Sequence, residues 1–515
     1  MILIFLILFL VGIFTHHASF LLAIYGDEWI DIYEFISENG RDQYPYFSPL
    51  PGILKYLAPW GSSFFIVGNL YKIFGTDYMP YYIVSFLFRM FATFSIYLFC
   101  QEIGRTMIKQ TNSQVKLLSF LIALFFLVSY TGIQNTDWAH YMNIYLASAF
   151  YIISTYFQIN FYQRFKTKDL WLHLLFITLS LISGSVRMFP LVFAIPVMDF
   201  IILLIYRKDY QKVRQIFVKF VGFLLIVVSL WGAGLFGGPF GVYSYGEWSF
   251  NKFLSVVISD IPGAIGTYLH WLGVLVVPDG SILGLFSIKL IGSIILLSIL
   301  VTILKLVKGN NSYLWSAIFG CNFLIFMLEM WYYNPILLID SSHRYLWVNF
   351  VTLLFYLTVI LFLVIKNNSL PRVLVYVVLV LLILIHLSST KAIYRYWLEN
   401  GRSSEFIKLT EQQIVNRFTS PIKAPVAIYL DVDDARVAHS VIFGLGFKIM
   451  VLSKTWDKQF YPVVYDDLKI LKKDLDLKKS ERWSKEDLIQ GVYAYRIRDK
   501  RISDITDEVR LLLSQ

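Results

Sequence analysis

Long apolar segments constrain this chain of 515 residues more than any other feature. About eleven of them approach the roughly 20 apolar residues that a helix needs to cross a bilayer. Charged residues make up 16% of the chain and hydrophobic residues 57%, whereas soluble domains carry about 25% charged residues. The sequence therefore predicts an all-α polytopic membrane protein. The predicted spans are 2–24, 80–100, 116–132, 141–161, 169–184, 188–206, 214–236, 281–306, 313–331, 345–365 and 371–388.

Basic loops set the predicted orientation. With eleven spans and a cytoplasmic N-terminus, all five short Lys- and Arg-containing loops lie on the cytoplasmic side. The segment 253–277 is also apolar, but Pro262, Gly263, Gly266 and His270 interrupt it, so we interpret it as re-entrant or interfacial. The loops also account for the net charge of +10, and we expect a plasma-membrane protein without a nucleic-acid partner. The basic loops are 102–116, 163–169, 207–214, 305–311 and 366–372.

This orientation divides the chain into two predicted domains. A transmembrane domain over 1–390 carries long extracytoplasmic loops at 25–79 and 237–280. The segment 397–515 is richer in Lys, Asp and Glu and predicts a small soluble α/β domain, also extracytoplasmic. Its pattern predicts strands at 424–432, 448–452 and 491–498 and a helix at 433–444. The first span has neither a basic n-region nor a clear cleavage site, so we expect it to be retained.

An acidic pair, Asp27 and Glu28, follows the first span directly. A carboxylate at a membrane–water boundary can take a proton from a hydroxyl while a lipid-borne substrate lies beside it. Apolar residues at helical spacing over 29–37 predict a helix along the membrane surface that would hold both acids in place. The alternative is a solvated helix end, since acids tolerate the interface.

Two arginines stand at predicted outer helix ends, against the usual charge bias. Arg187 lies in a turn between two spans, and Arg344 lies between His343 and Tyr345 just before another. Guanidinium groups match phosphate oxygens, so these arginines are candidate phosphate ligands that His343 or Tyr345 could assist. The alternatives are a lone helix-end arginine and a charged helix cap.

Three further polar residues are candidates. Arg89 lies inside the second span. Three interpretations are open: it binds substrate, it forms a structural pair, or its side chain snorkels to the membrane surface. Asp137 and His140 form an outer acid–histidine pair, which is either functional or a structural hydrogen bond. The two cysteines, Cys100 and Cys321, are far apart, and we predict no metal site.

Together these residues supply a base and phosphate anchors on one membrane face. Such a set suits glycosyl transfer from a polyprenyl-phosphate sugar, in which the acid deprotonates an acceptor hydroxyl that attacks the anomeric carbon. The arginines would neutralise charge on the departing lipid phosphate.

Over residues 1–390 the chain resembles the GT-C superfamily of integral membrane glycosyltransferases, which contains protein O-mannosyltransferases and the lipid A aminoarabinose transferase. The resemblance implies Asp27 as catalytic base, Glu28 orienting it or contacting substrate, and Arg187 and Arg344 as donor-phosphate ligands. It also implies an inverting enzyme without a cofactor, although a weakly bound divalent cation stays compatible with it. The matching stretches are 27–28, 46–51, 69–75, Arg89, 183–187 and 344–345.

The chain departs from the family pattern in two places. The Arg344-Tyr345 pair lacks the proline that often follows closely, and the C-terminal segment matches no extracytoplasmic domain of the family. The resemblance therefore does not identify the acceptor hydroxyl, which could belong to a glycan, a lipid or a protein. Two alternatives stay open: a ligase or polymerase that uses a diphosphate-linked glycan, and a lipid-linked oligosaccharide flippase, for which Arg89 and Glu329 would be the midplane charges.

Overall fold

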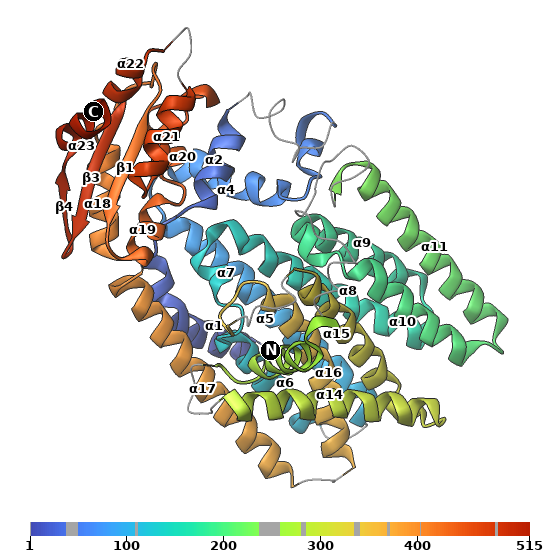
Figure 1. Cartoon of the computed structure of the whole chain (residues 1–515). Helices are drawn as coiled ribbons and strands as arrows, with labels where there is room; N and C mark the ends of the chain where they lie inside the picture. The colour runs from blue at the N-terminus through green and yellow to red at the C-terminus, as the bar shows by residue number, and fades with distance from the viewer. Residues whose placement is uncertain are drawn as a thin grey trace.

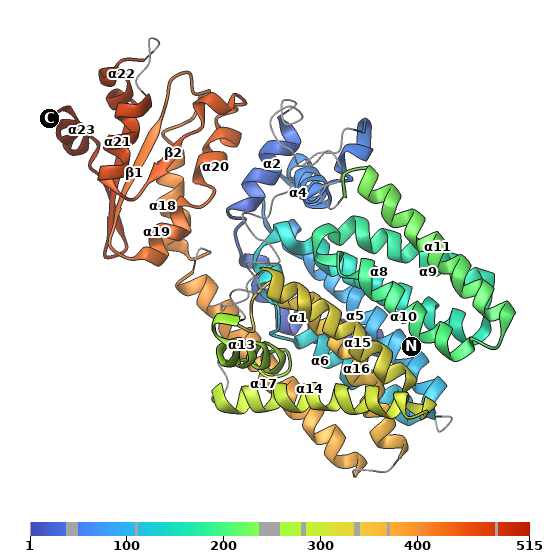
Figure 2. The same cartoon turned by 45° about the vertical axis from the view of Figure 1, so that its right-hand side comes forward.

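The computed structural model describes residues 2–37, 50–108, 112–235, 258–279, 285–333, 340–367, 371–401, 403–478 and 483–515. A large helical body is joined to a smaller C-terminal unit, α18 to α23, which is built around a sheet (Figure 1). Helix α17 leads from the body to this unit in both views (Figures 1 and 2).

Each of the eleven predicted spans coincides with a helix. Eight of the described helices are long and apolar enough to cross a membrane. Helices α6 and α10 are apolar but shorter, and α8 carries many polar residues because almost its whole surface is buried against protein. The chain is thus a multi-pass membrane protein. The helices are α1 (Ile2–His16), α5 (Met79–Ile108), α6 (Asn112–Val128), α8 (Met142–Arg164), α9 (Thr167–Gly184), α10 (Leu191–Tyr206), α11 (Tyr210–Gly232), α14 (Leu285–Val307), α15 (Leu314–Tyr333), α16 (Leu346–Lys366) and α17 (Arg372–Glu399).

Helix α8 lies at the centre of the body, packed against α9 and α5. Buried apolar side chains from α5, α6, α15 and α16 form one continuous core with those of α8. Helices α11, α14 and α17 instead expose leucine, valine and phenylalanine side chains along one side. Apolar surface of this kind is what lipid tails cover in a bilayer.

The interrupted apolar segment forms helix α13 (Ile261–Val274), which packs against α14. A Cβ atom on Gly273 or Gly292 would lie 2.0 or 1.9 Å from a backbone oxygen of the partner helix, so both positions require glycine. Helix α13 has 14 residues. At about 1.5 Å per residue it is roughly 21 Å long, shorter than the hydrocarbon core of about 30 Å.

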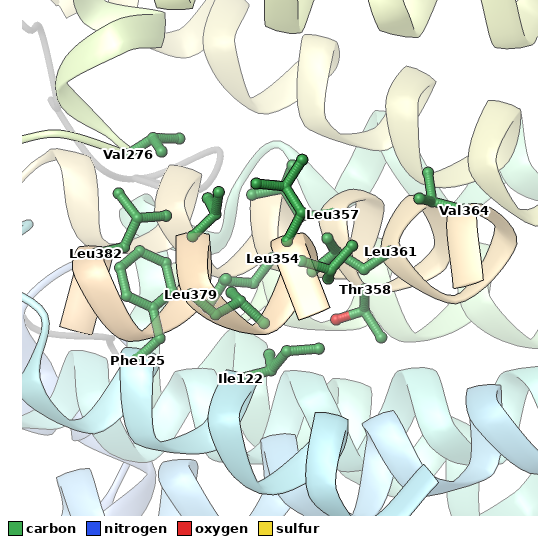
Figure 3. Close-up of a pocket in the computed structure, with 13 residues that line it drawn as sticks. Ile122, Phe125, Val276, Leu354, Leu357, Thr358, Leu361, Val364, Leu379 and Leu382 are labelled. Carbon is green, nitrogen blue, oxygen red and sulfur yellow. The ribbon is translucent and has the colours of Figure 1, made fainter. Parts of the chain in front are cut away.

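An apolar cavity of about 280 Å³ lies between α6, α16 and α17. Figure 3 shows Phe125, Leu354, Leu379 and Leu382 around it, with Thr358 as its one polar lining residue. The cavity therefore suits an apolar chain and offers no cation for a phosphate.

The sheet of the C-terminal unit has the strand order β2-β1-β3-β4. Strand β1 is parallel to β2 and β3, and β4 pairs antiparallel with β3. One apolar core contains α18, α19 and α20, and a second one, formed with β1 and β3, contains α21, α22 and α23. The elements are α18 (Glu405–Val415), β1 (Ala427–Val432), α19 (Ala435–Ile442), α20 (Leu445–Leu452), β2 (Val463–Tyr465), α21 (Leu468–Lys478), α22 (Lys485–Gln490), β3 (Val492–Arg498), β4 (Arg501–Asp504) and α23 (Thr506–Ser514).

Three of the four elements predicted here are confirmed, as β1, α19 and β3. The strand predicted at 448–452 is wrong, because this segment belongs to helix α20. Helix α20 is buried on two sides: Leu445 and Ile449 face the sheet, whereas Met450 and Val451 face α2 (Asp27–Ile36). Burial on two sides gives a short continuous apolar run, which periodicity alone does not distinguish from a strand.

Candidate functional site

The acidic pair begins helix α2, which confirms the predicted helix after the first span. Its N-cap is Gly26 at φ +59°. Trp29, Ile32 and Tyr33 are buried against α4 (Gly61–Phe74) and α20. Packing on both sides fixes the orientation of α2, and with it the position of the acids at its start.

The carboxylate of Glu28 binds two backbone amides. Its side chain is fully buried and accepts hydrogen bonds from the amide N–H of Tyr25 at 3.2 Å and of His140 at 3.4 Å. It thereby fastens the start of α2 to the short helix η3 (Ala139–Tyr141). Asp27 is half-buried, and its side chain makes no hydrogen bond or ion pair to another described residue.

Two further acids of α2 have fixed partners. Oδ2 of Asp31 lies 2.7 Å from Nδ1 of His140, and both side chains are buried. Oε1 of Glu34 lies 2.8 Å from Nζ of Lys458 in the C-terminal unit. Of the four carboxylates on α2, Asp27 alone is thus without a fixed partner among the described residues.

The buried pair has coupled protonation. Burial raises the pKa of Asp31 to about 6, although the charge of His140 pulls it down. Burial lowers the pKa of His140, but the charge and hydrogen bond of Asp31 outweigh it, so this pKa is raised above its ordinary value. The imidazolium form is therefore favoured beside the ionised acid, close to Asp27.

The two outer arginines meet over the same tyrosine rings. The guanidinium carbon of Arg187 lies 3.6 Å from the ring centre of Tyr345 and 5.5 Å from that of Tyr141. The guanidinium carbon of Arg344 lies 5.2 and 5.1 Å from the same two centres and 4.5 Å from that of Trp138. Nε of Arg344 is buried without a hydrogen-bond acceptor in the described structure. The Nε–H of Arg344 can therefore donate to an anion while the rings hold its guanidinium.

His343 adjoins this cluster as a neutral group. Its ring lies 4.7 Å from the ring of Tyr345, and its Nδ1 accepts a hydrogen bond from the backbone N–H of Tyr345 at 3.3 Å. Burial and the charges of Arg344 and Arg187 lower the pKa of His343 to about 3. At neutral pH it therefore adds no third positive charge.

A backbone pairing holds the loop that carries Arg344. Residues 340–345 receive two main-chain hydrogen bonds from residues 132–135: Gly132 N–H to Ser341 O at 2.9 Å and Gln134 N–H to Ser342 O at 3.0 Å. Ser341 Oγ also donates to Asp279 Oδ1 at 2.6 Å. The position of Arg344 is thus set by the same loop that leads to His140.

The turn that carries Arg187 is held by polar side chains. Nδ2 of Asn143 donates to the carbonyl of Ser183 at 2.8 Å and to Oγ of Ser62 at 2.9 Å. Ser185 then takes a left-handed φ of +43° and opens the short helix η4 (Ser185–Met188). This break in the helix turns Arg187 toward the tyrosine rings.

Tyr141 connects the acid with the arginines. Its phenol interacts electrostatically with Arg344, Arg187 and Asp27. The structure therefore brings together Asp27, His140, Arg187, Arg344 and Tyr345, although they come from four separate parts of the sequence. The combination offers a carboxylate, which can accept a proton, and two cations, which can bind an anion such as a phosphate.

Two predicted residues have other surroundings. Arg89 is 1% exposed, and its guanidinium donates to the carbonyl of Ser129 at 2.8 Å and to the hydroxyl of Tyr145 at 3.2 Å, which favours the structural interpretation. The expected Asp137–His140 pairing is wrong, because Nδ1 of His140 binds Asp31 instead. Asp137 is buried at the end of α7 (Gln134–Asp137).

Sequence reasoning missed Asp31, Trp138 and Tyr141. A signal for Asp31 was available, since Asp27, Asp31 and Glu34 follow one another at intervals of four and three and so share one helix face. Motif residues 46–49, and residues 237–257 and 280 of the predicted loop 237–280, lie outside the described residues. Within the described ranges, no group of three His, Cys, Asp or Glu side chains is arranged to hold a metal ion.

Neither a protein-family model nor a curated protein matches the sequence. Among solved structures, the chain is similar to two of ArnT from Cupriavidus metallidurans. The apo structure is 10% identical, with a TM-score of 0.46 over 96% of this chain and 93% of that one. The structure bound to undecaprenyl phosphate is 11% identical, with a TM-score of 0.45 over the same shares.

Proposed function

We propose that this protein is a glycosyltransferase that moves a sugar from a polyprenyl-phosphate donor to an acceptor hydroxyl, with Asp27 as general base. One observation carries the proposal. On α2 the other three carboxylates are fixed by protein partners, whereas that of Asp27 is not. Two residues before Asp27, the ring of Tyr25 packs at 6.2 Å from that of Trp138, which also holds the guanidinium of Arg344.

In this mechanism Asp27 takes the proton of the acceptor hydroxyl as its oxygen attacks the anomeric carbon. The bond from that carbon to the phosphate oxygen breaks, and the electron pair leaves with the lipid phosphate. A single displacement of this kind inverts the configuration of the sugar.

The two arginines would stabilise the departing phosphate. Their ring contacts hold both guanidinium groups in one place, and the buried Nε of Arg344 still needs an acceptor. Preorganised cations lower the cost of the charge that develops in the transition state. His343, being neutral, could donate one further hydrogen bond.

Glu28, Asp31 and His140 act as supports in this account. Glu28 fixes the backbone on both sides of the acid, and the Asp31–His140 pair joins α2 to η3. The proposal places the N-terminus in the cytoplasm and the cluster, with the C-terminal unit, on the outer face of the plasma membrane.

The test is a donor panel offered to the purified protein. Polyprenyl-monophosphate sugars and polyprenyl-diphosphate glycans are incubated separately, with and without EDTA, and released lipid phosphate is measured by mass spectrometry. We expect turnover of at least one monophosphate donor, including slow hydrolysis by water, unchanged by EDTA. Turnover of diphosphate donors alone would favour a ligase or polymerase. Movement of intact lipid-linked glycan across vesicles, without bond cleavage, would favour a flippase.

A further inference from the structure

The C-terminal unit contacts the site through helix α2. Figures 1 and 2 both show α20 beside α2. The hydroxyl of Tyr33 donates to the carbonyl of Trp456 at 2.7 Å, and that of Tyr25 donates to the carbonyl of His439 at 2.7 Å. The C-terminal unit is therefore hydrogen-bonded to Tyr33 within α2 and to Tyr25, the residue before the N-cap Gly26.

The turn between α19 and α20 contacts the residues just before α2. Phe443 in the turn is half-buried, and its ring centre lies 5.6 Å from that of Tyr25 and 5.8 Å from that of Trp138. Trp138 is the ring that also carries the guanidinium of Arg344. Phe443 thus supports the surroundings of both the acid and one arginine.

The contact needs glycine on both sides. A Cβ on Gly26 would lie 2.1 Å from the ring of Phe443, and a Cβ on Gly444 would lie 2.5 Å from the Cα of Gly26. Both glycines have positive φ, +59° and +84°. The two backbones therefore touch directly, at the residue before Asp27.

We propose that Phe443 is a positioning residue, which seats against Gly26 and Trp138 and fixes the direction of the Asp27 carboxylate. This inference rests on the proposed function. It means that the C-terminal unit completes the site. Sugar transfer is then fast only while the 443–444 turn packs against Gly26 and Trp138. A displacement of a catalytic group by about 1 Å can cost as much as 100-fold in rate.

The test compares Phe443→Ala with Phe443→Tyr and with Phe447→Ala. Phe447 lies in the same interface, with ring centres 5.4 Å from Tyr33 and 4.8 Å from Tyr461, but it is not among the groups that crowd Gly26. Its loss weakens the interface without touching the turn. We measure thermal unfolding, donor KM and kcat for each variant, using the donor found active in the panel.

We expect Phe443→Ala to lower kcat by roughly 10- to 100-fold with donor KM nearly unchanged, and Phe443→Tyr to restore most of the rate. Phe447→Ala should keep kcat within about threefold, since it displaces no catalytic group. In an Asp27→Asn background, Phe443→Ala should have little further effect, because both changes act through one carboxylate.

Equal losses of kcat in Phe443→Ala and Phe447→Ala would overturn the inference, since Phe443 would then be ordinary packing. Full additivity with Asp27→Asn would also overturn it. Failure of the wild-type protein to turn over any monophosphate donor would instead refute the proposed function, and so the two failures are distinguishable.

Discussion

At the scale of single residues, burial explains why the acids of α2 differ. A buried carboxylate without a partner is costly, so Glu28, Asp31 and Glu34, which are at most 2% exposed, each have a donor or a cation at hand. Asp27 is half-buried and keeps contact with solvent. Its carboxylate is therefore accessible to an acceptor hydroxyl, as the proposed role of general base requires.

The guanidinium of Arg344 is expected to bind the donor phosphate. Replacing it by Gln should raise donor KM by about tenfold or more, since charge-assisted hydrogen bonds contribute about 1.5–3 kcal/mol each. Lysine should restore little of this, because it lacks the planar fork. Arg395→Gln is the control, since Arg395 is exposed on α17. Unchanged donor KM in Arg344→Gln would contradict the assignment.

The Asp31–His140 pair predicts a pH dependence of stability. Both pKa values are raised in the folded protein, so it binds more protons than the unfolded chain between about pH 4 and the raised pKa of His140. The stability from these groups is present at low pH and is lost as pH rises through about 6 for Asp31 and then through the raised value for His140.

The measurement is thermal unfolding between pH 5 and 8.5 of the wild type and of Asp31→Asn/His140→Gln. The advantage of the wild type over the double variant should shrink as pH rises, by on the order of 1 kcal/mol for the Asp31 part, because its pKa of about 6 leaves only about one pH unit of the loss inside this range. A difference that is constant, or that grows with pH, would show that the pair does not take up protons on folding.

At the scale of elements, the close approach of Gly132 to α16 holds the Arg344 loop in place. Gly132 has φ +68°, and a Cβ there would lie 2.9 Å from the backbone N of Trp347. Gly132→Ala should therefore lower stability by about 2–4 kcal/mol and raise donor KM. Gly309→Ala is the matched control, since Gly309 also has positive φ but has no atom within 4 Å of the added Cβ. Similar losses in both variants would show that crowding at Trp347 is unimportant.

Helices α10 and α11 are joined by a buried ion pair between Lys219 and Asp199, 2.5 Å apart. Lys219→Met should cost about 3–5 kcal/mol, because it leaves a buried carboxylate uncompensated. Adding Asp199→Leu should recover most of this loss. Lys212→Met, which breaks the partly exposed pair with Asp209, should cost under about 1 kcal/mol. Detergent-based thermal unfolding checks all three, and no recovery in the double variant would contradict the argument.

At the scale of the whole molecule, the helical body was predictable because apolar length is a strong local signal. All eleven predicted spans coincide with helices, although residues 448–452 were misassigned because burial on both sides hides a helical period. Three elements of the C-terminal unit were also predictable. The packing of this unit against α2 was not, since it depends on contacts such as Tyr25–His439 between residues 414 positions apart.

The site was predictable in its residue types but less so in its pairings. Arg187 and Arg344 stood out because positive charges at predicted outer helix ends go against the usual charge bias, and Asp27 stood out because it directly follows the first span. The partner of His140 was not predictable, since Asp31 lies 109 positions away in the sequence. Arg89 also stood out as a charge at a predicted span, and the fold alone shows that its two terminal guanidinium nitrogens donate to Tyr145 and Ser129.

The central claim is that Asp27 accepts the proton of the acceptor. The direct measurement is kcat for sugar transfer by Asp27→Asn beside Asp77→Asn, an exposed acid in the same predicted loop that accepts a hydrogen bond from the amide of Met79 at 3.3 Å. We predict that Asp27→Asn lowers kcat by about 100- to 10,000-fold while the protein stays folded and binds donor, and that Asp77→Asn stays near the wild-type rate. Normal turnover by folded Asp27→Asn protein would show that the base lies elsewhere.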